Sequence, residues 1–281
     1  MKLTRTFLIG IFILATALLA GPAAAQDCVE PPAGLVSWWP GDGDALDIVS
    51  GNDGRLVSGA TFAPGFVNSG NGEAFNLNGY VEIADSPSLR PNTFTIDAWI
   101  FPTSYNFGFI MGKGDHEFFL QMASSLKTLR GGINVGGYKV HTGTTTVPLN
   151  AWSHVAVTYD GFDIRLYLDG NLEPGSFSIT APVLPFTAAS IYIGKHPYNL
   201  FQGLIDEAEF FDRALSASEI QSIFDAGSAG KCGKPPPPPT IGELLERIEA
   251  LEDHTHTYRT GDGVGHNSTE AETGAAEVPA E

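Results

Sequence analysis

The chain has few positively charged residues. Its 281 residues include 15 Lys and Arg against 32 Asp and Glu, which gives a formal net charge of −17 at pH 7. A surface that binds nucleic acid needs basic side chains to neutralise phosphates. The composition therefore argues against nucleic acid as a partner, and it suits a protein that binds cations or stays soluble outside a cell.

Long apolar runs are also scarce, apart from residues 7–20 near the N-terminus. This run is shorter than the roughly 20 residues that cross a bilayer. Lys2 and Arg5 precede it and three alanines end at Ala25, so residues 1–25 are predicted to be a signal peptide that is cleaved after Ala25. An uncut signal anchor is the alternative, and a lipoprotein is disfavoured by the polar residues before Cys28. The mature protein is expected to be secreted, periplasmic or on the cell surface, with no membrane span.

The chain has only two cysteines, Cys28 and Cys232. In an exported protein they are expected to form a disulfide, because the compartments outside the cytosol are oxidising. Two unpaired thiols are the alternative. Such a bond would close residues 28–232 into one loop.

Turn-forming and strand-forming residues are plentiful, with Gly 33, Pro 19 and 11% aromatics. Phe94, Ile96, Ala98 and Ile100 alternate with more polar neighbours, which predicts a strand with one buried face. Further strands are predicted at residues 35–39, 80–84, 152–159, 164–168, 191–194 and 203–211. The dipeptides Asn-Gly at 78–79 and Asp-Gly at 160–161 and 169–170 predict hairpin turns.

One helix is predicted near the end of these strands. Ser216 and Glu219 form a capping box at its start, and Gly227 is a plausible stop. Because strands alternate with turns and no strand–helix–strand rhythm appears, the fold class is predicted to be an all-β sandwich with one short helix.

Three segments resemble the laminin-G-like, concanavalin-A-like jelly-roll domains of secreted proteins. They are FNLNGYVEIADSPSL with FTIDAWIFPT, NAWSHVAVTYDGFDIRLYLDGNL, and IYIG with FQGLIDEAEFFDRALSASEIQSIF. The resemblance implies two antiparallel sheets packed face to face in residues 28–232, with the first and last strands adjacent.

The resemblance also implies a structural Ca²⁺ between an early acidic loop and the last strand. The matching residues are Asp47, Asn52 and Asp206, whose side chains offer the oxygen ligands that Ca²⁺ prefers. The alternative is that the acids of the loop only form solvated turns.

Binding is expected rather than catalysis. Glycosidases with two flanking carboxylates are known on sandwiches of this kind, and Glu207 and Glu209 alternate on one strand. The third acid expected before them is missing, and the chain has no G-x-S-x-G, H-E-x-x-H or C-x-x-C motif. The family instead implies glycan or protein ligands. Aromatic and imidazole rings in or beside turns are candidates to stack on sugars, although some of them could belong to the core: Tyr105, Tyr138, His141, His196 and Tyr198.

The C-terminal segment is predicted to be a tether followed by a tail. Residues 233–240 are a proline-rich linker. Residues 241–253 predict a short coiled-coil-like helix with Ile241, Leu244, Ile248 and Leu251 at core positions. It would assemble a homo-oligomer, such as a trimer, or dock on a partner. The alternative is a helix that is mostly frayed.

The remaining residues, 254–281, are expected to be largely disordered. His254 and His256 resemble the His-x-His segments of phage-type tail fibres, which implies a transition metal. Together these features predict a secreted, non-catalytic binding module. A structural or adhesion protein that oligomerises through its tail is the alternative, and a glycan-degrading enzyme is a third.

Overall fold

The computed structural model describes residues 28–68, 71–179 and 184–233. The signal peptide, nearly all of the linker, the 241–253 helix, the trimer that it would form, and the metal site at His254 and His256 lie outside these residues. They stay predictions.

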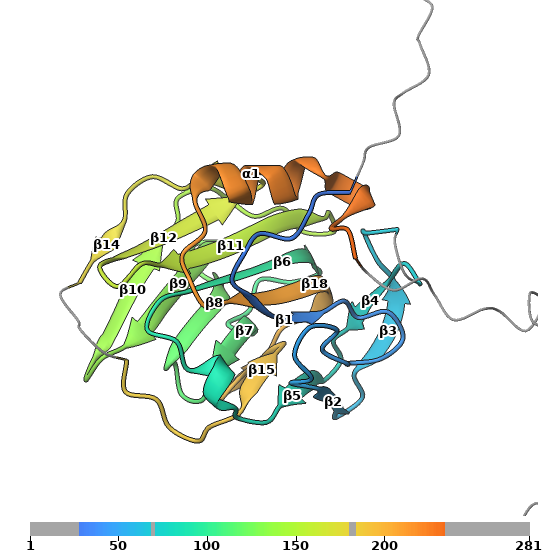
Figure 1. Cartoon of the computed structure of the whole chain (residues 1–281), viewed down its shortest axis with the longest axis horizontal. Helices are drawn as coiled ribbons and strands as arrows, with labels where there is room; N and C mark the ends of the chain where they lie inside the picture. Colours follow the sequence, from blue (N-terminus) through green and yellow to red (C-terminus); the bar gives the residue numbers. More distant parts are fainter. Residues whose placement is uncertain (1–27, 69–70, 180–183, 234–281) are drawn as a thin grey trace, which may run out of the picture. The chain divides into compact units, whose positions relative to one another are not determined.

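The described residues form two antiparallel sheets that pack face to face (Figure 1), as the sequence predicted. One sheet has the order β13–β12–β11–β6–β18–β4–β3, with β1 and β14 paired to β18 and β12. Its strands are β1 (Leu35–Trp39), β3 (Thr61–Pro64), β4 (Glu73–Asn76), β6 (Phe94–Pro102), β11 (Ser153–Tyr159), β12 (Asp163–Leu168), β13 (Asn171–Leu172), β14 (Phe177–Ser178) and β18 (Gly203–Phe211).

The second sheet has the order β10–β9–β8–β7–β15–β5–β2. Its strands are β2 (Gly54–Val57), β5 (Tyr80–Ile83), β7 (Phe109–Lys113), β8 (Phe118–Ala123), β9 (Thr128–Asn134), β10 (Tyr138–Thr142) and β15 (Ile191–Ile193). A separate small hairpin joins β16 (Lys195–His196) to β17 (Asn199–Leu200), and short 3₁₀ turns occur at Pro87–Leu89 and Gly227–Ala229. In the part of the chain that the structure describes, no helix is long and apolar enough to cross a membrane.

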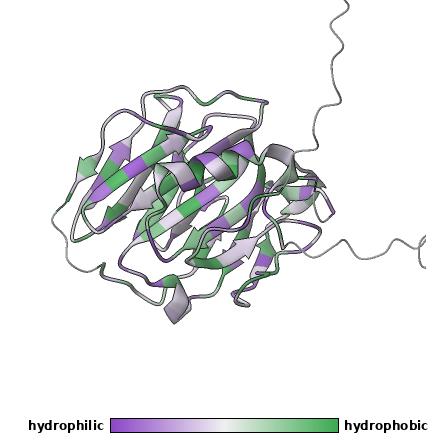
Figure 2. Ribbon diagram, turned by 45° about the horizontal axis from the view of Figure 1, so that its top comes forward, coloured by the Kyte–Doolittle hydropathy of each residue, from purple (hydrophilic) through white to green (hydrophobic). Residues whose placement is uncertain are grey.

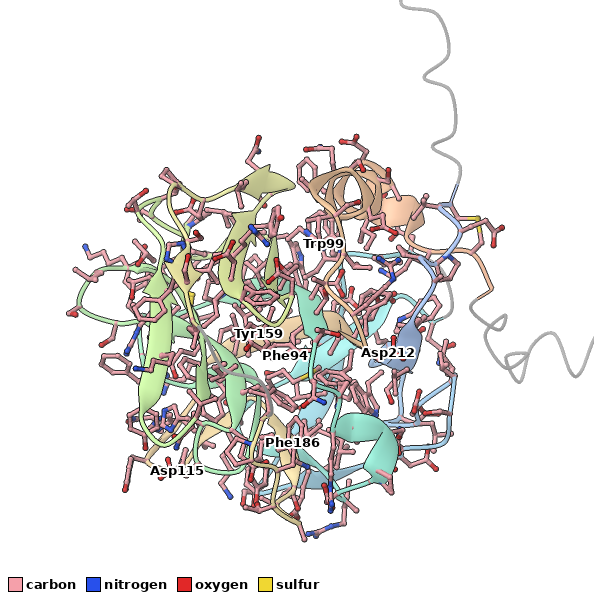
Figure 3. All side chains as sticks on the ribbon, turned by 60° about the vertical axis from the view of Figure 1, so that its left-hand side comes forward. Phe94, Trp99, Asp115, Tyr159, Phe186 and Asp212 are labelled. Carbon is pink, nitrogen blue, oxygen red and sulfur yellow. A yellow bond between two sulfur atoms is a disulfide. The ribbon has the colours of Figure 1, made fainter. Side chains whose placement is uncertain are left out.

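The core lies between the two sheets. The predicted inward face of β6, which carries Phe94, Ile96, Ala98 and Ile100, is buried in it. The Phe94 ring lies 5.1 Å from that of Phe118 on the opposite sheet. Figure 3 places Phe94 beside Tyr159 in the interior, and Figure 2 shows apolar and polar residues alternating along the strands. Burying each large apolar side chain contributes roughly 1.5–3 kcal/mol.

The helix α1 (Ala217–Asp225) covers part of the outer face of the first sheet (Figure 1). The Ser216–Glu219 capping box begins it, and Gly227, at φ +52°, follows its last turn. Ile220 and Ile223 pack in a second, smaller cluster with three residues of the sheet: Ala156, Tyr167 and Phe211.

The two ends of the domain meet. β1 pairs with β18, so the first and last long strands are adjacent, as the resemblance implied. Cys28 and Cys232 form the predicted disulfide, with Cα atoms 5.1 Å apart. Beside it, Val29 and Lys231 form a parallel bridge. The disulfide thus links segments that the backbone already holds together.

The hairpin predicted at Asn78–Gly79 is wrong. β4 and β5, which flank it, belong to different sheets, so the chain crosses between the sheets here. Glycine is needed for another reason, because a Cβ at Gly79 would lie 2.1 Å from the backbone oxygen of Val57. The close approach of two backbones, rather than a two-residue turn, explains the Asn-Gly pair.

Candidate functional site

Three of the ring-bearing residues predicted to bind ligand lie together on the outer face of the second sheet. Tyr138 begins β10, and His196 and Tyr198 belong to the β16–β17 hairpin. They surround His116, in the turn between β7 and β8: its ring centroid is 4.9 Å from Tyr138 and 4.7 Å from His196, which is 5.6 Å from Tyr198. We call these four residues the aromatic–histidine cluster.

The cluster combines a buried floor with an exposed rim. Phe109 and Phe119 are stacked and fully buried beneath it, with centroids 5.7 Å apart. The two imidazoles meet the Phe109 ring edge-on at 5.2 and 5.0 Å. Tyr138 is 55% exposed and Tyr198 is 83% exposed. The two tyrosine rings therefore lie beside packed histidines and remain open to solvent.

The backbone at His116 is unusual. Its φ is +68°, a left-handed conformation that few residues other than glycine adopt. Asp115 precedes it at the periphery of the domain (Figure 3), and its carboxylate lies 2.7 Å from the His116 Nδ1 atom. The turn therefore directs the His116 ring back over the sheet and fixes one of its nitrogens.

The hydrogen-bond partners assign the protons of both imidazoles. Asp115 accepts from Nδ1–H of His116, which leaves its Nε2 as an acceptor. The Tyr198 backbone N–H donates to Nδ1 of His196, so the Nε2 of His196 carries a proton. The two Nε2 atoms are 3.0 Å apart, which fits a hydrogen bond from His196 to His116. Burial, and then the neighbouring His116, lower the pKa of His196, which favours the neutral form of His196.

The other two predicted ring residues lie elsewhere. The half-buried Tyr105 packs against the core, and its hydroxyl donates to the Val147 carbonyl at 2.8 Å. His141 is buried, and this burial lowers its pKa. Neither is brought to the cluster.

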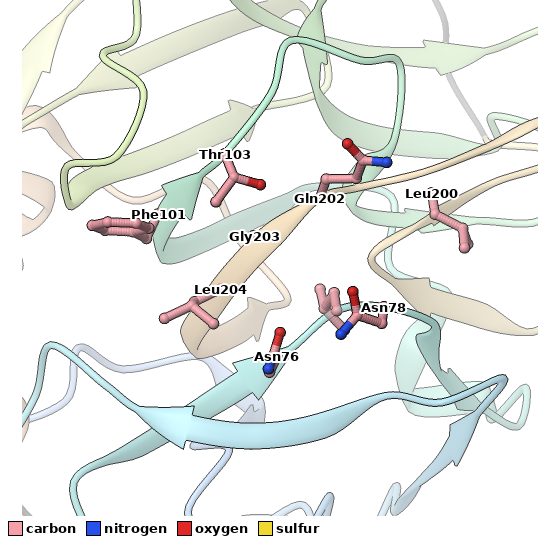
Figure 4. A pocket seen from close by; sticks show the side chains of 9 residues that line it. Asn76, Asn78, Phe101, Thr103, Leu200, Gln202, Gly203 and Leu204 are labelled. Atoms are coloured by element: carbon pink, nitrogen blue, oxygen red, sulfur yellow. The ribbon is translucent and has the colours of Figure 1, made fainter.

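A second concave site was not anticipated from the sequence. A cavity of ≈ 490 Å³ opens where β4 and β6 end and β18 begins (Figure 4). Its polar lining comes from Asn76, Asn78, Thr103 and Gln202, with Phe101 among its apolar residues. We call it the amide groove. It shares the β16–β17 hairpin with the cluster, because Leu200 also lines it.

Hydrogen bonds already engage Asp47 and Asp206, the two aspartates of the predicted Ca²⁺ site, so an ion would have to displace their donors. The Asp47 carboxylate accepts hydrogen bonds from the backbone N–H groups of Trp38, Val49, Ser50 and Asn52, and from the Ser50 hydroxyl. These backbone hydrogen bonds outweigh burial and lower its pKa. One oxygen of Asp206 accepts from Phe66 and Val67, in a different loop. No described group of three or more His, Cys, Asp or Glu residues is arranged to hold a metal.

The acids of β18 are closed to substrate in this structure. Asp206 and Glu209 are 0% exposed and Glu207 is 1% exposed. Glu207 accepts a hydrogen bond from the Trp38 indole at 2.9 Å, and Glu209 forms an ion pair with Lys231 at 2.7 Å. Burial raises the pKa of Glu209. These carboxylates hold the first strand and the last segment onto β18.

The model of the concanavalin A-like lectin/glucanases superfamily matches residues 71–221, more than half of the 281-residue chain. The chain belongs to this superfamily. The matched region contains the aromatic–histidine cluster and the amide groove. The disulfide lies outside it.

Several solved structures share the fold at low sequence identity. Domain 4 of AbnA, an extracellular arabinanase from Geobacillus stearothermophilus solved with arabinotriose, is 20% identical with a TM-score of 0.55, over 66% of this chain and 96% of that one. The binding domain of Paraclostridial Mosquitocidal Protein 1 is 16% identical with a TM-score of 0.56, over 68% and 52%. Trypanosoma rangeli sialidase is 17% identical with a TM-score of 0.54, over 69% and 33%.

A curated relative is the Adhesion G-protein coupled receptor V1 of Danio rerio. It is 25% identical over 150 residues, which are 49% of this chain and 2% of the receptor. The match therefore concerns one domain within a much longer protein.

Proposed function

We propose that this protein is a secreted glycan-binding module and that the sugar lies on the aromatic–histidine cluster. The observation that carries the proposal is the convergence of separate segments on one exposed spot, with Tyr138 from β10 and Tyr198 from the β16–β17 hairpin. Tyrosine rings offer flat apolar faces together with a hydroxyl. Such sites combine apolar walls with a few oriented polar groups.

Membership of a superfamily that contains lectins supports binding. So does the arabinanase domain that was solved with arabinotriose, a fold neighbour with a sugar ligand. Hydrolysis is less well supported, since the acids of β18 are buried. An extracellular protein as ligand is the other candidate, and an array of glycans separates the two.

The test is a glycan array followed by titration of the best ligand with a Tyr138→Ala/Tyr198→Ala variant. Loss of both rings should weaken binding by about tenfold or more, which corresponds to about 1.4 kcal/mol. The matched control is Phe162→Ala, which removes a ring that is 68% exposed in the turn between β11 and β12. Because all three side chains are exposed, the variants should melt close to the wild type.

The amide groove supplies the competing location. An Asn76→Ala/Gln202→Ala variant should bind like the wild type. If this variant loses binding while the tyrosine variant keeps it, the ligand belongs in the groove and the location proposed here is wrong. If no glycan binds at all, the glycan-binding function itself is refuted.

A further inference from the structure

Arg130 is a cation on the same face of the second sheet as the cluster. It lies on β9, opposite Gln121 of β8, and Gln121 lies opposite Phe109 of β7. Residues directly opposite each other on neighbouring antiparallel strands point to the same face. Arg130 is thus two strands from Phe109, whose ring supports both histidines of the cluster.

The Arg130 guanidinium makes no hydrogen bond or ion pair with any residue that the structure describes. The four other described arginines each pair with a carboxylate: Arg55 with Glu82, Arg90 with Asp85, Arg165 with Asp160 and Arg213 with Glu219. With a net charge of −17, the chain has an excess of acidic side chains over basic ones. The absence of a carboxylate beside this one arginine is therefore a specific feature of this face.

Arg130 is also partly buried. Burial lowers its pKa, since the charged form loses part of its hydration. A buried charge costs free energy unless a partner compensates it. Its neighbour Gln121 is 2% exposed, and the Oε1 atom of Gln121 has no hydrogen-bond partner among the described residues. A donor and an acceptor, both without partners, thus sit side by side on the sheet face.

The charge of Arg130 also acts on the cluster. After burial, His116 and Asp115, it is a further influence on the pKa of His196, and it lowers that pKa. A ligand that covers Tyr138 and runs along β10 would meet the guanidinium, since Arg130 lies opposite Thr142, four residues along that strand from Tyr138. The rings would hold its apolar face, and the guanidinium would hold an anionic group.

We infer that the ligand of the cluster is an acidic glycan, and that Arg130 binds the carboxylate of one of its sugars. This inference rests on the proposed glycan-binding function. A guanidinium forms two parallel hydrogen bonds with a carboxylate, which gives it both affinity and orientation. The acidic chain as a whole repels anions. Recognition of the carboxylate must therefore come from this local contact.

The experiment uses two matched pairs of sugars, titrated calorimetrically into the protein. They are trigalacturonate with its carboxyl-reduced trimer, and 3′-sialyllactose with lactose. Wild-type protein should bind the acidic member of at least one pair about tenfold more tightly than the neutral member. Arg130→Gln should bind both members equally, and Arg130→Lys should retain part of the preference because it keeps the charge without the planar fork.

Arg55→Gln is the matched control, because Arg55 already pairs with Glu82 on β5 of the same sheet. It should leave the preference unchanged. Melting curves of the Arg130 variants should stay close to the wild type, so that lost binding is not lost folding.

The outcomes separate the two proposals. Equal binding of acidic and neutral sugars by the wild type would overturn the inference and leave glycan binding intact. A preference for acidic sugars that survives in Arg130→Gln would also overturn it. If no sugar of either pair binds and the array is empty, both fail. Binding of an aspartate-rich peptide without binding of any sugar would assign the face to a protein partner instead.

Discussion

Removing the disulfide should destabilise this domain more than any substitution on its surface. Cys28 and Cys232 are separated by 204 residues. The chain-entropy relation gives a loop of that length a stabilisation of about 5 kcal/mol at 25 °C. A domain of this size loses roughly 2–4 °C in melting temperature per kcal/mol. The Cys28→Ala/Cys232→Ala variant should therefore melt roughly 10–20 °C below the oxidised wild type.

The native contacts at the joined ends do not offset this loss. The backbone hydrogen bonds from Val29 to Gly230 and from Cys232 to Val29, at 3.0 and 2.8 Å, do not involve the sulfur atoms, so we expect them to form in both proteins. The disulfide acts mainly on the unfolded ensemble, which gains freedom when the crosslink is removed.

The assay is thermal and urea unfolding followed by circular dichroism. The native spectra of the two proteins should agree. The unfolding transition of the wild type in the presence of a reductant should resemble that of the variant. A melting temperature of the variant within about 2 °C of the wild type would refute the reasoning, because it would mean that the unfolded chain gains little freedom.

Other predictions concern the interior, the metal and pH. Gly79→Ala should lower the free energy of unfolding by about 1–3 kcal/mol, measured in urea, because its Cβ would meet a backbone oxygen at 2.1 Å. Lys231→Met should cost about 3–5 kcal/mol by leaving the buried Glu209 unpaired, whereas Lys231→Met/Glu209→Gln should recover most of that loss. EDTA or added Ca²⁺ should not shift the melting temperature, since hydrogen-bond donors already occupy both Asp47 oxygens; a rise with Ca²⁺ would show that a site does form. Because folding lowers the pKa of His196, the unfolded chain takes up a proton at this histidine at a higher pH than the folded chain does. The free energy of unfolding should therefore fall as pH drops from 6.5, the ordinary pKa of histidine, through the lower pKa of the folded state. This part of the pH dependence should vanish in His196→Phe, and an unchanged profile would contradict it.

Much of the fold could be predicted from the sequence because its strongest signals are local. Alternation identified the buried face of β6, the capping box located α1, and the Asp-Gly pairs at 160–161 and 169–170 marked two turns that the pairing of β11, β12 and β13 confirms. The prediction at Asn78–Gly79 was wrong because its glycine is required by a close backbone approach to a strand more than twenty positions earlier in the chain. No local pattern reports such a contact.

The site was only partly predictable for the same reason. Tyr138, His196 and Tyr198 were selected as rings near turns, and the structure brings them together. No local pattern singles out His116, although it lies at the centre of the cluster, because 80 positions of the chain separate it from His196. Arg130 gave no signal, since the absence of a partner is visible only once the positions of the acids are known.

The joined ends of the domain also determine how it would respond to being pulled. Val29 and Lys231 form a parallel β-bridge beside the Cys28–Cys232 bond. Tension that enters the chain before residue 28 and leaves after residue 232 would pass through one covalent bond and bypass the sandwich. The sheets and the ligand-binding face would carry no load. In the alternative in which residues 1–25 stay uncut as an anchor, the domain could be stretched between its two flanking segments without unfolding and without releasing a bound ligand.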